Sequence, residues 1–129
     1  MNFLSKYQPQ LLSVLRIVAG LLFLEHGTSK LLHFPHVAMF DHLIPLLIVA
    51  GVIELLGGLL LTLGFFTRIA AFVCSGEMAV AYWMMHVGGS GFFWPVLNGG
   101  EAAILFCFVF LYIAAAGPGP WSIDDARSR

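Results

Sequence analysis

Long apolar segments, each interrupted by a few polar residues, make up most of this 129-residue chain. An α-helix needs about 20 apolar residues to cross the hydrocarbon core of a bilayer. Segments of about that length span residues 11–32, 45–64, 69–87 and 96–116, with short connections between them. The pattern predicts an all-α integral membrane protein, a four-helix bundle that forms a single membrane domain over residues 1–129.

The first segment repeats small and charged residues every seven positions, which keeps them on one face of a helix. Small residues let a neighbouring helix come close, and charged residues are costly to expose to lipid. We therefore expect this face to point into the bundle. Its residues are Ser13, Gly20 and Gly27 in one row and Arg16, Phe23 and Lys30 in the adjacent row.

The second and third segments each carry one glutamate near their middle. Glu54 is flanked by glycines on a predicted packing face, and Glu77 falls at a similar depth in the third segment. A carboxylate at that depth needs a cation, a hydrogen bond or a proton. We expect Arg16 or Lys30 to be the partner of Glu54.

Composition agrees with a membrane location, because 60% of the residues are hydrophobic and only 10% are charged. The net charge of −1 and the absence of a basic tract in the sequence argue against nucleic-acid binding. The first segment is read as a retained span and not a signal peptide, because its apolar run continues to Leu32 without a small-residue cleavage site.

Basic residues outside the spans set the predicted orientation, since they favour the cytoplasmic side. They place both termini and residues 65–68 in the cytoplasm, and the loops 33–44 and 88–97 outside. Only Lys30 lies towards the outer side. The residues on the cytoplasmic side are Lys6, Arg68, Arg127 and Arg129.

Cysteines and histidines were considered as redox or metal centres. Cys74 and Cys107 form no C-x-x-C pair, which argues against a dithiol that exchanges electrons with quinone. His26 and His86 could ligate haem, but paired histidines inside spans do not by themselves favour it. We expect no metal site. The candidates considered for one were His33, His36 and His42, which follow one another as H-x2-H-x5-H beside Asp41, together with His86.

Each predicted span holds one glutamate, which indicates a functional or pairing role for this residue type. Glu54, Glu77 and Glu101 fall on inward faces, whereas Glu25 falls on the far side of the first helix. The alternative is an ion-pair network that only specifies the bundle. The residues predicted to line a polar, ligand-binding pocket are Arg16, His26, Lys30, Glu54, Glu77, Asn98 and Glu101.

Four motifs together resemble the DoxX family. They are R-x3-G-x6-G-x2-K-L from Arg16, G-x2-E-x2-G-G from Gly51, N-G-G-E from Asn98, and GPGPWSID from Gly117. Their order and spacing cover almost the whole chain. The resemblance implies a small four-helix protein of the bacterial inner membrane. Some relatives are subunits of quinol oxidase or thiosulfate:quinone oxidoreductase systems.

The resulting leading hypothesis is an accessory subunit that binds quinone or quinol and works with a redox partner subunit. Whether the chain is itself an enzyme stays open, because it shows no redox centre of its own. The alternatives are a small-solute or proton transporter, for which a homodimer is expected, and a structural membrane anchor without a ligand. Substrate, partner and oligomeric state do not follow from the sequence.

Overall fold

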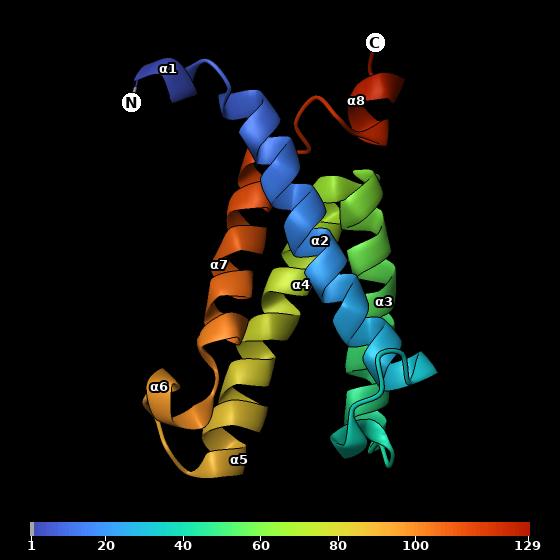
Figure 1. Ribbon diagram of the computed structural model, residues 1–129, viewed down its shortest axis with the longest axis vertical. Coiled ribbons are helices and arrows are strands. Elements are labelled where there is room, and N and C mark those ends of the chain that lie inside the picture. The colour runs from blue at the N-terminus through green and yellow to red at the C-terminus, as the bar shows by residue number, and fades with distance from the viewer. Residues whose placement is uncertain (1) are drawn as a thin grey trace.

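The computed structural model describes residues 2–129, and these contain helices and loops but no β-strand. Figure 1 shows their arrangement, with both termini at the same end of the molecule. In chain order the elements are α1 (Asn2–Ser5), α2 (Gln8–Leu32), η1 (Ala38–Phe40), α3 (Pro45–Leu63), α4 (Thr67–Ala81), η2 (Tyr82–Val87), α5 (Gly88–Ser90), α6 (Pro95–Asn98), α7 (Glu101–Ala116) and α8 (Ile123–Arg127).

The long helices form two packed pairs, α2 with α3 and α4 with α7, and α3 also contacts α4. The pairs lie close together at the end that carries the termini, here called the termini end. They diverge towards the opposite end, which carries the loops before α3 and α7 and is here called the loop end (Figure 1). The backbones of the two pairs are therefore farther apart at the loop end than at the termini end (Figure 1).

Glycines bring the backbones of α2 and α3 into direct contact. A Cβ atom at Gly27 would lie 2.4 Å from the backbone nitrogen of Leu55, and one at Gly58 would lie 2.5 Å from that of Leu24. Neither backbone could move away without separating the helices. The predicted inward face of α2 is confirmed, because all six of its residues are buried: Ser13, Arg16, Gly20, Phe23, Gly27 and Lys30.

The α4/α7 pair is held by apolar packing and by interhelical hydrogen bonds from Ser75 and from Arg68, whose guanidinium donates to the carbonyl oxygens of Ala114 and Ala115. The Ser75 hydroxyl donates to the carbonyl oxygen of Cys107 at 2.7 Å. Phe110 and Ile113 of α7 are fully buried and belong to the same core as Phe23 of α2. This core lies where α2 crosses α7, so it joins the two pairs.

The fourth helix begins later than the predicted residue 96. Pro95–Asn98 is a separate turn, α6, which ends at Gly99 with φ +70°, a left-handed conformation that glycine adopts without strain. The side chain of Asn98 then accepts a hydrogen bond from the backbone N–H of Gly100 at 2.8 Å. Asn98 therefore lies outside the fourth long helix, although the predicted span 96–116 includes it.

Large apolar side chains cover the outward faces of the helices, including Leu21 on α2, Val49 on α3, Phe72 on α4 and Phe108 on α7. Helices α2 and α3 are long and apolar enough to cross a membrane, and α7 is apolar but shorter. The all-helical architecture is confirmed. A bundle of four membrane crossings with cytoplasmic termini stays a prediction.

Candidate functional site

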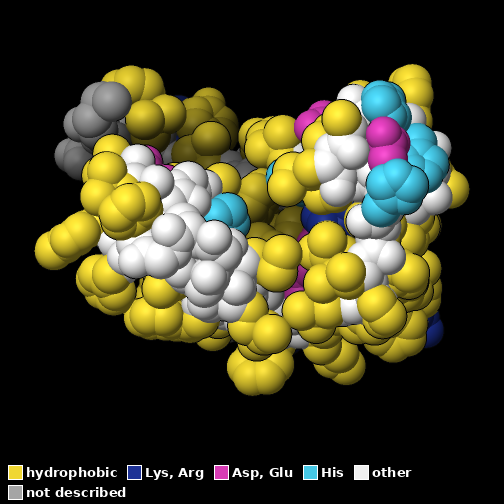
Figure 2. All heavy atoms as spheres, turned by 90° about the horizontal axis from the view of Figure 1, so that it is seen from below, with side chains coloured by type: hydrophobic (Ala, Val, Ile, Leu, Met, Phe, Trp, Pro, Cys, Tyr) yellow, Lys and Arg dark blue, Asp and Glu magenta, His cyan; other side chains and the backbone are white. Residues whose placement is uncertain are grey.

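The loop end is hollowed between the two helix pairs. Figure 2 views the molecule from this end and shows a recess with basic and acidic side chains in its depth, surrounded by apolar ones. The recess is here called the hollow.

Lys30, near the loop end of α2, and Glu54 of α3 form an ion pair, and this buried pair with the acid beside it is here called the floor. The Nζ atom of Lys30 lies 2.6 Å from Oε1 of Glu54, and the two side chains are only 9% and 3% exposed. The ring of Phe40, from η1, lies over the same ammonium at 4.7 Å from its centroid. Of the two partners predicted for Glu54, Lys30 is correct and Arg16 is wrong.

Glu77 of α4 lies beside this pair and faces both Glu54 and Lys30. Both carboxylate oxygens of Glu77 are buried, and no group within residues 2–129 hydrogen-bonds to them. Next to it, the thiol of Cys74 fills the space left by Gly57, where a Cβ atom would lie 2.3 Å from the sulfur. Two carboxyl groups and one cation thus share a buried site, so their charges do not cancel.

Aromatic rings form one wall between α2 and α7. The imidazole of His26 meets the ring of Phe106 edge to face, with centroids 6.2 Å apart. Phe23 contacts Phe106 and Phe110 at 5.6 and 4.9 Å. Sequence reasoning missed Phe40 and Phe106 because their type and position differ little from those of lipid-facing residues. His26 is exposed on its helix and remains available to a ligand.

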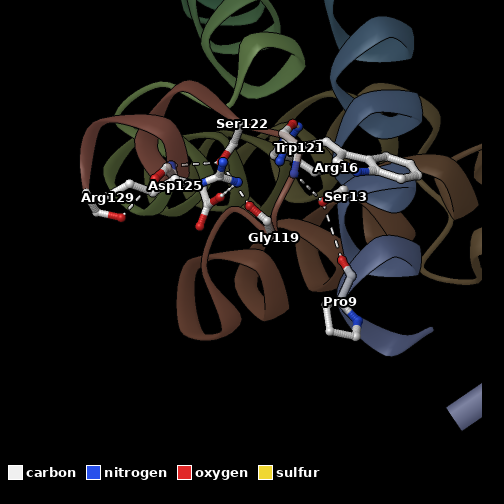
Figure 3. A network of polar contacts seen from close by, with 9 residues as sticks. Pro9, Ser13, Arg16, Gly119, Trp121, Ser122, Asp125 and Arg129 are labelled. Carbon is white, nitrogen blue, oxygen red and sulfur yellow. Dashed lines mark hydrogen bonds and ion pairs between the residues drawn. The ribbon is translucent and has the colours of Figure 1, made fainter. Parts of the chain in front are cut away.

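Arg16, predicted as a pocket residue, is instead buried near the termini end. Its guanidinium donates to the carbonyl oxygens of Leu61 at 2.9 Å, Pro118 and Trp121. Figure 3 shows it among the residues of the C-terminal segment 117–129. Its acceptors are backbone oxygens, and their location explains the failure of the prediction: the segment 117–129 folds back onto α2.

Further contacts fix the C-terminal segment. The hydroxyl of Ser13 accepts from the backbone N–H of Trp121 at 3.2 Å (Figure 3). Gly119, with φ +77°, passes so close to Ser13 that a Cβ atom would lie 2.3 Å from its hydroxyl oxygen. The glycines and prolines of GPGPWSID are the signal that could have indicated a bound turn.

Asp124 in the same segment caps α4. Its carboxylate accepts from the backbone N–H groups of Phe66 at 3.0 Å and Thr67 at 2.9 Å. Burial alone would raise the pKa of Asp124, but these hydrogen bonds and the charge of Arg127 outweigh it and hold the pKa below its ordinary value. The capping acceptors of α4 thus come from a residue more than 50 positions later in the chain.

The structure does not bring Asn98 or Glu101 to the floor. The amide of Asn98 donates to the backbone oxygens of Phe92 and Phe93 at 3.0 and 3.3 Å and thus holds its own turn. Glu101 is exposed at the start of α7, so its predicted inward position is wrong. Glu25 is exposed on α2, as expected from its place on the far side of that helix.

The histidines of the loop end are dispersed. Nε2 of His36 lies 2.7 Å from Asp41, and the rings of His33 and His36 are 6.4 Å apart. Within residues 2–129 no three histidine, cysteine or acidic side chains gather in a way that could hold a metal ion. His86, the other haem candidate, places Nδ1 3.1 Å from the carbonyl oxygen of Asn98. His42 is exposed.

Two other grooves lie away from the ion pair. One, of about 390 Å³, lies between η2 and α7 and is lined mainly by apolar and aromatic side chains such as Trp83 and Phe108. The other, of about 560 Å³, lies at the termini end beside Arg68 and Asp124. Neither contains the buried charges, so the hollow is the better candidate for chemistry.

Comparison with known proteins identifies the family. The DoxX family model matches residues 11–87, which include Lys30, Glu54 and Glu77. An uncharacterised protein of Haemophilus influenzae is 48% identical, with 97% of this chain and 96% of that protein aligned. The uncharacterised membrane protein Rv3486 of Mycobacterium tuberculosis is 26% identical, with 94% and 83% aligned. No solved structure matches the chain. The resemblance predicted from the motifs is confirmed, and the chain belongs to the DoxX family of membrane proteins.

Proposed function

We propose that the hollow binds the ring of a membrane-soluble quinone or quinol, and that the protein is the quinone-interacting subunit of an inner-membrane redox complex with both termini in the cytoplasm. The observation that carries the proposal is the buried group of Lys30, Glu54 and Glu77 in an otherwise apolar protein. Charges inside a membrane protein are costly and usually mark a functional site.

The chemistry of the floor and wall suits a flat ring with oxygen atoms at its edge. The ammonium of Lys30 has three N–H donors and uses one on Glu54, so a ring carbonyl could accept another. His26 and Phe106 offer flat surfaces against which a ring can pack. The hydrocarbon tail of such a ligand would leave through the divergent helix pairs into lipid.

Electron transfer would require a second protein. Cys74 and Cys107 are both free, and Cys107 is directed to the Ser75 hydroxyl at 3.5 Å. We therefore propose that this chain binds and positions the quinone while a partner subunit carries the electrons. This role is that of an accessory subunit.

A proton or cation pathway is the second candidate, and the unpartnered carboxyl of Glu77 favours it. The same acids would then act as relay positions, and the hollow would be one vestibule of the pathway. A chain of this size would be expected to work as a homodimer. A structural anchor, the third alternative, would need neither the hollow nor Glu77.

The test is quinone binding by the purified protein. Organic extraction with mass analysis shows whether quinone copurifies, and titration with a short-chain quinone analogue gives the affinity. Lys30→Met is expected to weaken binding at least about tenfold, the value of one charge-assisted hydrogen bond. Lys6→Met, at the exposed N-terminus, is the matched control and should leave the affinity unchanged.

Loss of folding must be separated from loss of binding. The double variant Lys30→Met with Glu54→Gln removes both charges of the pair, and it should stay folded but fail to bind. Binding that survives in this variant would reject the proposed site. If neither the natural protein nor any variant binds quinone, proton flux in vesicles becomes the measurement that decides for or against the second candidate.

A further inference from the structure

We infer that Glu77 and Glu54 share one exchangeable proton, held on Glu77, so that the floor is a proton-loading site. The inference goes beyond quinone binding, because it concerns the protein without any ligand. It starts from the unequal surroundings of the two carboxyl groups, which lie side by side on α3 and α4.

Glu54 is the ionised member of the pair. Its Oε1 lies 2.6 Å from the ammonium of Lys30, a distance typical of a charged hydrogen bond. The ring of Phe40 lies over the same ammonium on another side. Lys30 therefore neutralises Glu54.

Glu77 has no such partner. Its two oxygens are buried, and within the described chain no N–H or O–H group donates to either of them. The charged groups that face it are Lys30 from α2 and Glu54 from α3, while the nearest titratable group on its own helix is the thiol of Cys74. Cys107 of α7 is directed to Ser75 instead.

Protonation of Glu77 removes the uncompensated negative charge from this buried group. An ionised Glu77 would bury a negative charge beside another carboxylate, and two such groups at close range do not both ionise. A protonated Glu77 carries no charge, and its O–H group can donate to the carboxylate of Glu54. The three side chains then contain one cation and one anion.

Ligand binding at Lys30 would change the number of bound protons. If Lys30 turns from Glu54 towards a ligand in the hollow, Glu54 loses its countercharge. The carboxyl pair would then take up a second proton from water in the hollow, and its charge would change from −1 to 0. Binding and proton uptake are coupled in this way without a redox step.

Infrared spectroscopy of the purified protein tests the inference, since a protonated carboxyl group gives a C=O stretching band that shifts in D2O. Glu77→Gln, which preserves the shape of a protonated glutamate, should remove the Glu77 component of this band at neutral pH. The matched control is Glu101→Gln, whose exposed carboxyl should contribute nothing. Lys30→Met should about double the component, because Glu54 then also takes a proton.

The outcomes separate the two proposals. An unchanged band in Glu77→Gln, with circular dichroism showing an intact fold, would overturn the shared proton whether or not quinone binds. A band that disappears in Glu54→Gln and persists in Glu77→Gln would place the proton on Glu54 and overturn the inference. A correct band pattern without any quinone binding would support proton loading and reject the quinone site.

Discussion

Replacing Glu54 or Glu77 by glutamine should destabilise the protein to very different extents. Glu54→Gln removes the carboxylate that lies 2.6 Å from the ammonium of Lys30, whose side chain is only 9% exposed. Breaking a buried ion pair in this way costs about 3–5 kcal/mol. Glu77→Gln breaks no hydrogen bond in the described structure, so its cost should stay below about 1 kcal/mol.

Adding Lys30→Met to Glu54→Gln tests why the loss of the Glu54 carboxylate destabilises the protein. If the cost of Glu54→Gln arises from the stranded charge of Lys30, adding Lys30→Met should recover most of it, because an apolar side chain of similar length replaces the charge. Lys30→Met alone strands the carboxylate of Glu54 unless it takes a proton. It should therefore cost less than Glu54→Gln, since a carboxyl group can be neutralised near pH 7 more readily than an ammonium.

The assay is the free energy of unfolding in detergent micelles, measured by denaturant titration for the natural protein, the three single variants and the double variant. Each is compared in the same detergent, so that the unfolded state is the same. Equal costs for Glu54→Gln and Glu77→Gln would refute the assignment of the two carboxyl groups. A double variant no more stable than Glu54→Gln would refute the stranded-charge explanation.

Three further predictions concern the packing and the termini end. Gly27→Ala should lower the free energy of unfolding by about 1–3 kcal/mol, because the added Cβ would meet the backbone of α3. Gly76 faces open space, so Gly76→Ala should change it little, and denaturant titration of both variants checks this. Asp124→Asn should cost about 1 kcal/mol at neutral pH. Folding lowers the pKa of Asp124, so the stabilisation by its carboxylate is complete above the pKa of an ordinary aspartate and is lost as the pH falls through the lowered pKa. The free energy of unfolding of Asp124→Asn should therefore depend less on pH in the acid range than that of the natural protein. Arg16→Met should free the C-terminal segment, and limited proteolysis should then cleave after Arg127 sooner than in the natural protein; equal cleavage rates would count against the tether.

Periodic patterns in the sequence predicted the parts of the fold that depend on regular helices. The seven-residue spacing of Gly20, Gly27, Arg16 and Lys30 identified the buried face of α2 correctly, because the faces of a helix follow from residue number. The same counting brought Lys30 and Glu54 together, since both lie on glycine-lined faces that pack against each other.

The failures occurred where the chain leaves regular geometry. Glu101 was placed inward because the fourth helix was extended through Gly99, whose left-handed conformation breaks it. The partners of Arg16 were sought among acids, but its acceptors are backbone oxygens of a turn that helical periodicity cannot locate. Spacing along a helix carries no information about contacts made by loops.

The tether between Arg16 and the C-terminal segment has a consequence for how the protein is made. Arg16 is synthesised 102 residues before Pro118 and 105 residues before Trp121, so two of its three acceptors do not exist while the first helices leave the ribosome. Until residues 118–121 have been synthesised, this guanidinium has to be held by water or lipid headgroups. The termini end can therefore assemble only after all the long helices have been made, and a chain interrupted before Pro118 leaves Arg16 without two of its three acceptors.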